Sequence, residues 1–289
     1  MTELEPDDDG DEVEGDNADD ERMLFGEKRE ETTLLAGSGL GVTRIDVAAA
    51  QVGQFSLLDR GTVHGLATDG QTVIVATDEA VSRRTGDGLQ SLRFGPAAAV
   101  GIDGKWVYAA DSERVARLDR TGGLADATAE DWETVGSVDD PQRFVGNLLA
   151  AAELLRVGED LEAVGLSDVR DLSPDGALAA AADGIYENRE GDWERVYEGD
   201  ATAVVADGER AHAVVDGRLL ERDGEGWTEL SLPGTEPHLL AYGQTLAVID
   251  TEGTVHVAAD PGVTHDGHGG WRSQAIGLRD VTSFLALRE

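Results

Sequence analysis

The stretch from Thr62 to Gly95 contains four short β-like runs separated by turns, and the rest of the chain repeats this pattern. Apolar or alternating residues predict strands in four places: Val63–Ala67, Val73–Thr77, Val81–Arg84 and Leu89–Phe94. The first two runs are joined through Asp69-Gly70, a pair that favours tight hairpins because glycine adopts positive φ at little cost. The stretch therefore predicts one four-stranded antiparallel sheet.

The hairpin between the second and third strands of this unit recurs seven times along the chain. Each copy has an apolar strand, an acidic or glycine turn and a new strand, and the copies lie at residues 35–42, 75–81, 108–115, 150–155, 181–186, 214–219 and 248–255. The turns that follow the first strands recur about every 28 to 44 residues, which leaves room for four short strands per unit. We therefore expect seven repeated sheets.

The two ends of the chain complete each other. Val281–Leu285 reads as an inner strand with no successors, whereas Thr32–Leu58 contains three strands without an inner one. Joining them gives the seventh sheet and closes the array, so that no open sheet edge remains at either end. The predicted fold is therefore all-β, with seven four-stranded antiparallel blades closed by the C-terminal strand.

This pattern resembles seven-bladed β-propellers over about residues 32 to 288, and in composition it is similar to a haloarchaeal propeller family. The Gly-His and Trp-Asp dipeptides of WD40 blades are missing, and only the inverted pairs Asp131-Trp132 and Asp192-Trp193 occur. The resemblance thus implies WD40-like architecture without WD40 motifs. It also implies a rigid disc with two loop faces and a central channel.

Tryptophan opens the predicted outer strand in four repeats, at Trp132, Trp193, Trp227 and Trp271. A large ring at a fixed position of a repeat is expected to fill the widening gap between neighbouring blades. We interpret these residues as packing residues and not as a ligand site.

The charge of the chain is strongly acidic, with 59 Asp and Glu against 23 Lys and Arg and a net charge of −36. Dense surface carboxylates suit a concentrated salt solution, where screening removes most of their repulsion. Duplex nucleic acid needs clustered cations, so we expect no nucleic-acid partner. Without cysteine there is no disulfide or thiolate site.

Residues 1–31 hold fifteen acidic and three basic residues and few apolar ones, which predicts a disordered acidic tail before a propeller domain at 32–289. Asp7 to Asp9 stand where a signal peptide would carry positive charge, and no apolar run approaches the roughly 18 residues of a membrane span. We expect a cytoplasmic monomer with no membrane partner.

Catalytic motifs are not evident in the sequence, which has no Gly-x-Ser-x-Gly elbow and no Walker loop. His265 and His268 flank Asp266 in one loop and could contribute to a metal site, but a solvated polar loop is the favoured reading. We expect no cofactor and no bound metal, and we lean towards a protein without enzymatic activity.

A candidate binding site emerges when the inner strands are aligned on their first turns. The residue five positions before the turn is His64, Ala98, Gln142, Arg170, Thr202 or His238, with Thr282 or Ser283 in the closing blade. In a propeller this position borders the channel mouth, so His64, Arg170 and His238 should converge there, with Arg143 and Arg279 nearby. Histidine and arginine donors favour an anionic ligand or a partner's carboxylate, although an ordinary wet channel wall would also be polar.

Two long connections, Thr121–Asp131 and Ala259–Gly270, fall between third and fourth strands and therefore on the face opposite that mouth. Loops on a rigid scaffold often bind ligands or partners, although insertions without any function would explain these two connections equally well. The sequence favours a non-catalytic scaffold that binds a protein or a small anionic ligand through a loop face or the channel mouth. The alternative is a metal-assisted hydrolase or lyase at the same mouth, which a metal held by three or more side chains would reveal.

Overall fold

The computed structural model describes residues 31–48, 50–86, 88–208, 210–224, 226–259 and 270–287. The chain divides into Met1–Glu30 and Glu31–Glu289, and the described residues belong to the second unit. Of the predicted acidic tail, residues 1–30 lie outside the described residues, and Glu31 already begins a strand.

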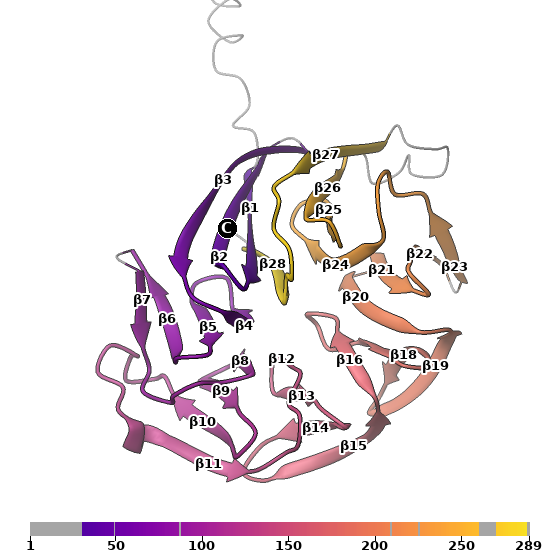
Figure 1. Ribbon diagram of the computed structural model, residues 1–289. Coiled ribbons are helices and arrows are strands. Elements are labelled where there is room, and N and C mark those ends of the chain that lie inside the picture. The colour runs from indigo at the N-terminus through magenta and orange to yellow at the C-terminus, as the bar shows by residue number, and fades with distance from the viewer. Residues whose placement is uncertain are drawn as a thin grey trace, which may run out of the picture. The chain divides into compact units, whose positions relative to one another are not determined.

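Seven four-stranded antiparallel sheets are arranged in a ring, which confirms the predicted propeller (Figure 1). We number the blades from the closing blade onwards and give their strands from the inside out. Blade 1 contains β28 (Ser283–Leu287), β1 (Glu31–Ser38), β2 (Gly41–Ala48) and β3 (Gln51–Arg60). Blade 2 contains β4 (Val63–Thr68), β5 (Val73–Thr77), β6 (Val81–Thr85) and β7 (Gly88–Ser91). Blade 3 contains β8 (Ala99–Asp103), β9 (Trp106–Ala110), β10 (Val115–Asp119) and β11 (Trp132–Gly136), and the 3-10 helix η1 (Ala129–Asp131) precedes β11.

The remaining four blades repeat the same order. Blade 4 contains β12 (Arg143–Val145), β13 (Leu148–Ala150), β14 (Glu153–Val157) and β15 (Leu161–Ser167). Blade 5 contains β16 (Val169–Leu172), β17 (Leu178–Ala181), β18 (Gly184–Arg189) and β19 (Asp192–Glu198). Blade 6 contains β20 (Ala201–Asp207), β21 (Arg210–Val215), β22 (Arg218–Asp223) and β23 (Gly226–Leu230). Blade 7 contains β24 (Pro237–Tyr242), β25 (Leu246–Asp250), β26 (Thr254–Ala258) and β27 (Trp271–Ala275).

Ring closure depends on β28, which pairs antiparallel with β1 from Gly37–Ser283 to Thr33–Leu287. The strand covers residues 283–287, two residues later than the predicted range, because Thr282 precedes the ladder and donates its amide to the Gly37 carbonyl at 2.9 Å. Phe284 is 2% exposed and packs in one cluster with Leu34 and Ile45. The predicted closure between the chain ends is therefore confirmed.

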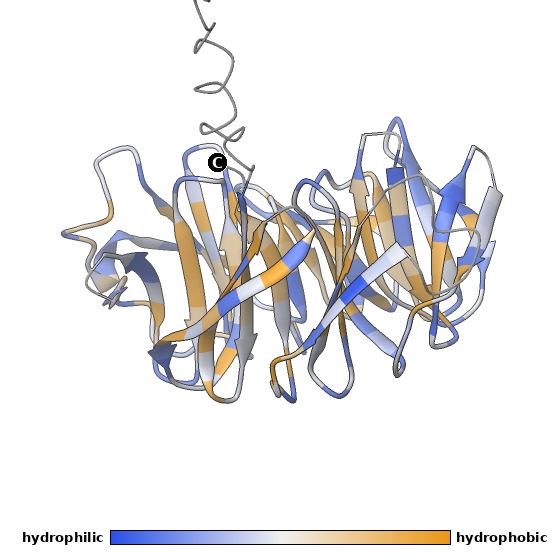
Figure 2. Cartoon of the chain, turned by 90° about the horizontal axis from the view of Figure 1, so that it is seen from above, coloured by the Kyte–Doolittle hydropathy of each residue, from blue (hydrophilic) through white to orange (hydrophobic). Residues whose placement is uncertain are grey.

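The core consists of apolar side chains between neighbouring blades. Figure 2 shows hydrophobic residues along the strands and many hydrophilic residues in the turns at both faces. Trp132 of blade 3 packs edge-on against Phe94, with ring centroids 4.9 Å apart, and its indole donates to the Leu92 carbonyl beyond blade 2. Trp271 of blade 7 donates in the same way to the Ser231 carbonyl beyond blade 6. These two tryptophans therefore join adjacent blades, as predicted.

We call the face where the inner strands begin the mouth face. The connection 120–131 between β10 and β11 lies on the opposite face, because it follows a third strand. The connection between β26 and β27 has the same place in its blade, but residues 260–269 lie outside the described ranges. Among the described helices, none has the length and apolar character needed to cross a membrane.

Candidate functional site

Four inner strands carry a β-bulge at the residue that the sequence alignment selects. The pairing of the inner strand with its neighbour shifts between Val63 and Gly65, and equivalent shifts occur in blades 5, 6 and 7. The extra residues are therefore His64, Arg170, Thr202 and His238. Because a bulge leaves its residue outside the ladder and re-aims the side chain, it can turn a strand residue toward the channel.

A cavity of about 140 Å³ lies at these positions, and we call it the mouth chamber. It brings together polar residues of five blades: His64, Gln142, Arg143, Arg170, Thr202 and Thr282. Three of the five candidate binding residues therefore lie together at one mouth, namely His64, Arg143 and Arg170. In the described part of the chain the His64 imidazole has no hydrogen-bonding partner, so it is free to meet a ligand.

The other two candidate residues do not line this chamber. His238 is half-buried, and its Nε2 lies 2.8 Å from the Val281 carbonyl oxygen, so that nitrogen donates to the backbone. Arg279 is exposed in the connection between β27 and β28, on the mouth face but outside the chamber lining. The sequence pattern could not distinguish a histidine that faces the ligand space from one that stabilises the closing segment.

Arg170 is engaged only at the surface. Its Nη1 lies 2.6 Å from Oδ1 of Asp200, and both side chains are about half exposed. An ion pair exposed to water contributes about 0–1 kcal/mol, so a ligand anion can compete for this guanidinium. Its remaining nitrogens have no partner among the described residues.

Arg143 is held more firmly, by a carboxylate that sequence reasoning missed. Its Nε lies 2.9 Å from Oδ1 of Asp171, which is 4% exposed. Asp171 also accepts the backbone amides of Leu172 and Val204. Burial raises the pKa of Asp171, and the Arg143 charge opposes this rise. The only signal in the sequence was an acidic residue directly after Arg170 in an inner strand.

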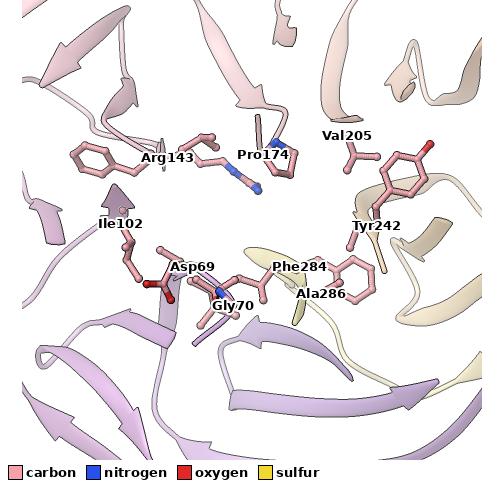
Figure 3. Close-up of a pocket in the computed structure, with 18 of the residues that line it drawn as sticks. Asp69, Gly70, Ile102, Arg143, Pro174, Val205, Tyr242, Phe284 and Ala286 are labelled. Atoms are coloured by element: carbon pink, nitrogen blue, oxygen red, sulfur yellow. Dashed lines mark hydrogen bonds between the residues drawn. The ribbon is translucent and has the colours of Figure 1, made fainter. Parts of the chain in front are cut away.

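A larger cavity of about 410 Å³, the channel chamber, begins on the other side of Arg143. Figure 3 shows the Arg143 guanidinium reaching into it from the wall. Much of its wall is apolar and comes from the later parts of the inner strands: Leu66, Ile102, Val145, Leu240, Leu285 and Ala286. Leu66, Arg143 and Phe144 line both chambers, so they form the boundary between them.

Tyr242 contributes its ring to the channel chamber while its hydroxyl binds elsewhere. The hydroxyl lies 2.5 Å from Nδ1 of the buried His212. Burial and the nearby Arg210 lower the pKa of His212 to about 3, and burial raises the pKa of Tyr242. The unprotonated Nδ1 of neutral His212 therefore accepts a hydrogen bond from the Tyr242 hydroxyl, which leaves an apolar ring edge at the chamber wall.

A row of Ser273, His256 and Asp250 in blade 7 has the residue types of a hydrolase triad. Ser273 Oγ lies 2.8 Å from His256 Nδ1, and His256 Nε2 lies 3.1 Å from Asp250 Oδ2. His256 is 1% exposed, Asp250 also accepts the amides of Glu252 and Thr254, and neither chamber includes the row. We interpret it as a structural network that fixes the β25–β26 turn.

The described residues contain no group of three or more histidines, aspartates and glutamates placed to hold a metal ion. The loop residues His265 and His268, which the sequence suggested as a partial metal site, lie outside the described ranges.

The chain matches the HVO_0234-like beta-propeller family over residues 18–287. No curated protein matches the chain significantly. Solved structures resemble it at the level of fold. AztD from Citrobacter koseri superposes with a TM-score of 0.52 at 11% identity, covering 88% of each chain.

Two larger proteins contain a similar propeller. The extracellular domain of a putative hybrid two-component system from B. thetaiotaomicron gives a TM-score of 0.54 at 8% identity, covering 78% of this chain and 37% of that one. PorZ, a surface component of the type-IX secretion system of Porphyromonas gingivalis, gives 0.54 at 14% identity, covering 78% and 34%. The chain thus matches little more than a third of either protein, and identities this low show the shared fold alone.

Proposed function

The chain belongs to the HVO_0234-like beta-propeller family, and from that premise we propose that it is a non-catalytic binding protein whose channel mouth takes a small oxoanion. A propeller supports a binding or scaffold role in general, because its rigid blades hold loops and channel residues in fixed positions.

The observation that carries this proposal is the set of bulges around the mouth chamber. His64, Arg170 and Thr202 occupy the same bulged position in three blades and line one cavity. Imidazole, guanidinium and hydroxyl groups all donate hydrogen bonds, and an arginine can hold an oxoanion at two points. A volume of about 140 Å³ suits an inorganic oxoanion or a very small carboxylate.

The alternative of a metal-assisted hydrolase or lyase fits this chamber less well. Such a site needs several free carboxylates or imidazoles to hold the metal ion, and His64 is the single histidine among the chamber's lining residues. Asp171 is the carboxylate among the chamber's lining residues, and it is engaged by Arg143 and two backbone amides. We therefore prefer anion binding.

Isothermal titration calorimetry in molar KCl tests the proposal, with inorganic phosphate, sulfate and oxalate as probes. We expect at least one probe to bind and Arg170→Ala to weaken its binding tenfold or more. Arg279→Ala is the matched control, because it removes the same charge from the same face outside the chamber. If none of the three binds, or if Arg170→Ala binds like the unaltered protein, the proposal is wrong.

A further inference from the structure

The channel chamber has a different chemistry from the mouth chamber, although the two share Arg143. Its volume of about 410 Å³ falls within the range of roughly 300–1,000 Å³ that is usual for sites of organic ligands. The mouth chamber is too small for such molecules. The channel chamber therefore has room for a ligand that the mouth chamber cannot take.

One cation projects into this space with part of its binding capacity unused. The Nε of Arg143 is paired with Asp171. In the described part of the chain, the two terminal nitrogens of Arg143 have no partner. These two nitrogens form the end of the guanidinium fork, which can donate two parallel hydrogen bonds to one carboxylate. Asp171 anchors the side chain, so little rotamer freedom is lost when a ligand binds.

The rest of the chamber favours an apolar body. Leu66, Ile102, Leu285 and Ala286 line it with aliphatic groups, and the Tyr242 hydroxyl is occupied by His212. Acidic groups occur where the inner strands end. Asp69 is paired there with Arg120, and Asp103 is exposed to water, which weakens its repulsion of an anion held at Arg143.

We propose that the channel chamber is a second binding site, specific for an amphipathic monocarboxylate whose carboxylate binds Arg143 and whose apolar body lies along the channel toward Ala286. This site does not depend on oxoanion binding at the mouth. It requires the cation and the apolar wall together, and either feature alone gives weak binding.

Three probes separate these requirements in calorimetric titrations of the full chain in molar KCl. Octanoate carries both features, 1-octanol lacks the charge and acetate lacks the apolar body. We expect octanoate to bind at least tenfold more tightly than either of the others. Equal affinity for octanoate and 1-octanol would overturn the proposal, because Arg143 would then play no part.

Two variants test where octanoate binds. Ala286→Phe fills the chamber without touching Arg143, and its matched control is Ala275→Phe on the exposed outer strand β27. Arg143→Lys keeps a cation beside Asp171 but removes the two-pronged fork. We expect Ala286→Phe and Arg143→Lys each to weaken octanoate binding tenfold or more, and Ala275→Phe to leave it unchanged.

The two proposed sites can be tested independently of each other. Arg170→Ala should leave octanoate binding unchanged, and Ala286→Phe should leave the binding of inorganic phosphate unchanged. If Arg170→Ala abolishes octanoate binding, or if Ala286→Phe does not affect it, octanoate does not occupy the channel chamber and this inference is wrong. Loss of phosphate binding alone would contradict only the proposed function of the mouth.

Discussion

Single buried residues in this propeller are held in one protonation state by their surroundings. His212 is 6% exposed, and its neutral ring links Tyr242 to the neighbouring strand. A proton on Nδ1 would reverse the direction of this hydrogen bond and bury a charge close to Arg210. The depressed pKa of His212 therefore makes the interface between blades 6 and 7 sensitive to acid.

Stability should fall when the pH drops below about 6.5. Unfolded histidine titrates near 6.5, whereas His212 in the folded protein has a pKa of about 3, so only the unfolded state takes up this proton between those values. The free energy of unfolding should therefore fall by about 2 kcal/mol between pH 6.5 and pH 5. Chemical denaturation at several pH values in molar KCl measures it.

His212→Gln should lose this part of the pH dependence of stability. His64→Gln changes an exposed histidine and leaves His212 in place, so it is the control and should keep that pH dependence. A pH profile for His212→Gln parallel to that of the unaltered protein would contradict the assignment.

Arg143 and Asp171 should be strongly coupled in stability. Arg143→Met leaves Asp171 buried without its counter-charge, which costs roughly 3–5 kcal/mol. Replacing both residues, as in Arg143→Met with Asp171→Asn, should restore much of that loss, because the uncompensated charge is removed. A double-mutant cycle by chemical denaturation measures the coupling, and simple additivity of the two substitutions would show that the pair contributes little.

At the scale of whole elements, β28 is the strand on which the ring depends. It supplies the inner edge of blade 1 and buries Phe284 between β1 and its neighbours. A chain that ends at Arg279 lacks this strand and should lose cooperative thermal unfolding. A chain that ends at Leu287 keeps β28 complete and serves as the control. Equal melting temperatures of the two chains, followed by circular dichroism, would show that closure is dispensable.

The sequence predicted elements better than it predicted side-chain directions. Seven hairpins with acidic or glycine turns are local signals, and they led to the correct number of blades and the correct closure. A bulge has no such local signature, because it depends on how two strands pair. The alignment therefore found the positions of His64 and Arg170 but could not show that His238 binds the Val281 carbonyl. The channel chamber was missed because its wall consists of ordinary core residues.

At the scale of the whole molecule, the net charge of −36 should dominate the response to salt. The Debye length falls from about 10 Å at 0.1 M to about 3 Å at 1 M, so molar salt removes most of the repulsion between surface carboxylates. We expect the melting temperature to rise steeply with KCl and similarly with NaCl, because screening depends on ionic strength. A melting temperature that does not change between 0.1 and 2 M would contradict this explanation of the charge.

The pairing of β1 with β28 also has a consequence for biosynthesis. Gly37 pairs with Ser283, so blade 1 lacks its inner strand until residues 283–287 have been translated. At about 5–20 residues per second, the ribosome needs roughly 10–50 s to synthesise the residues between these two strands. During that interval the nascent chain exposes the β1 edge and the apolar surface that Phe284 later covers. Blades 2 to 7 can form while the chain emerges, but blade 1 stays incomplete until β28 has left the ribosome.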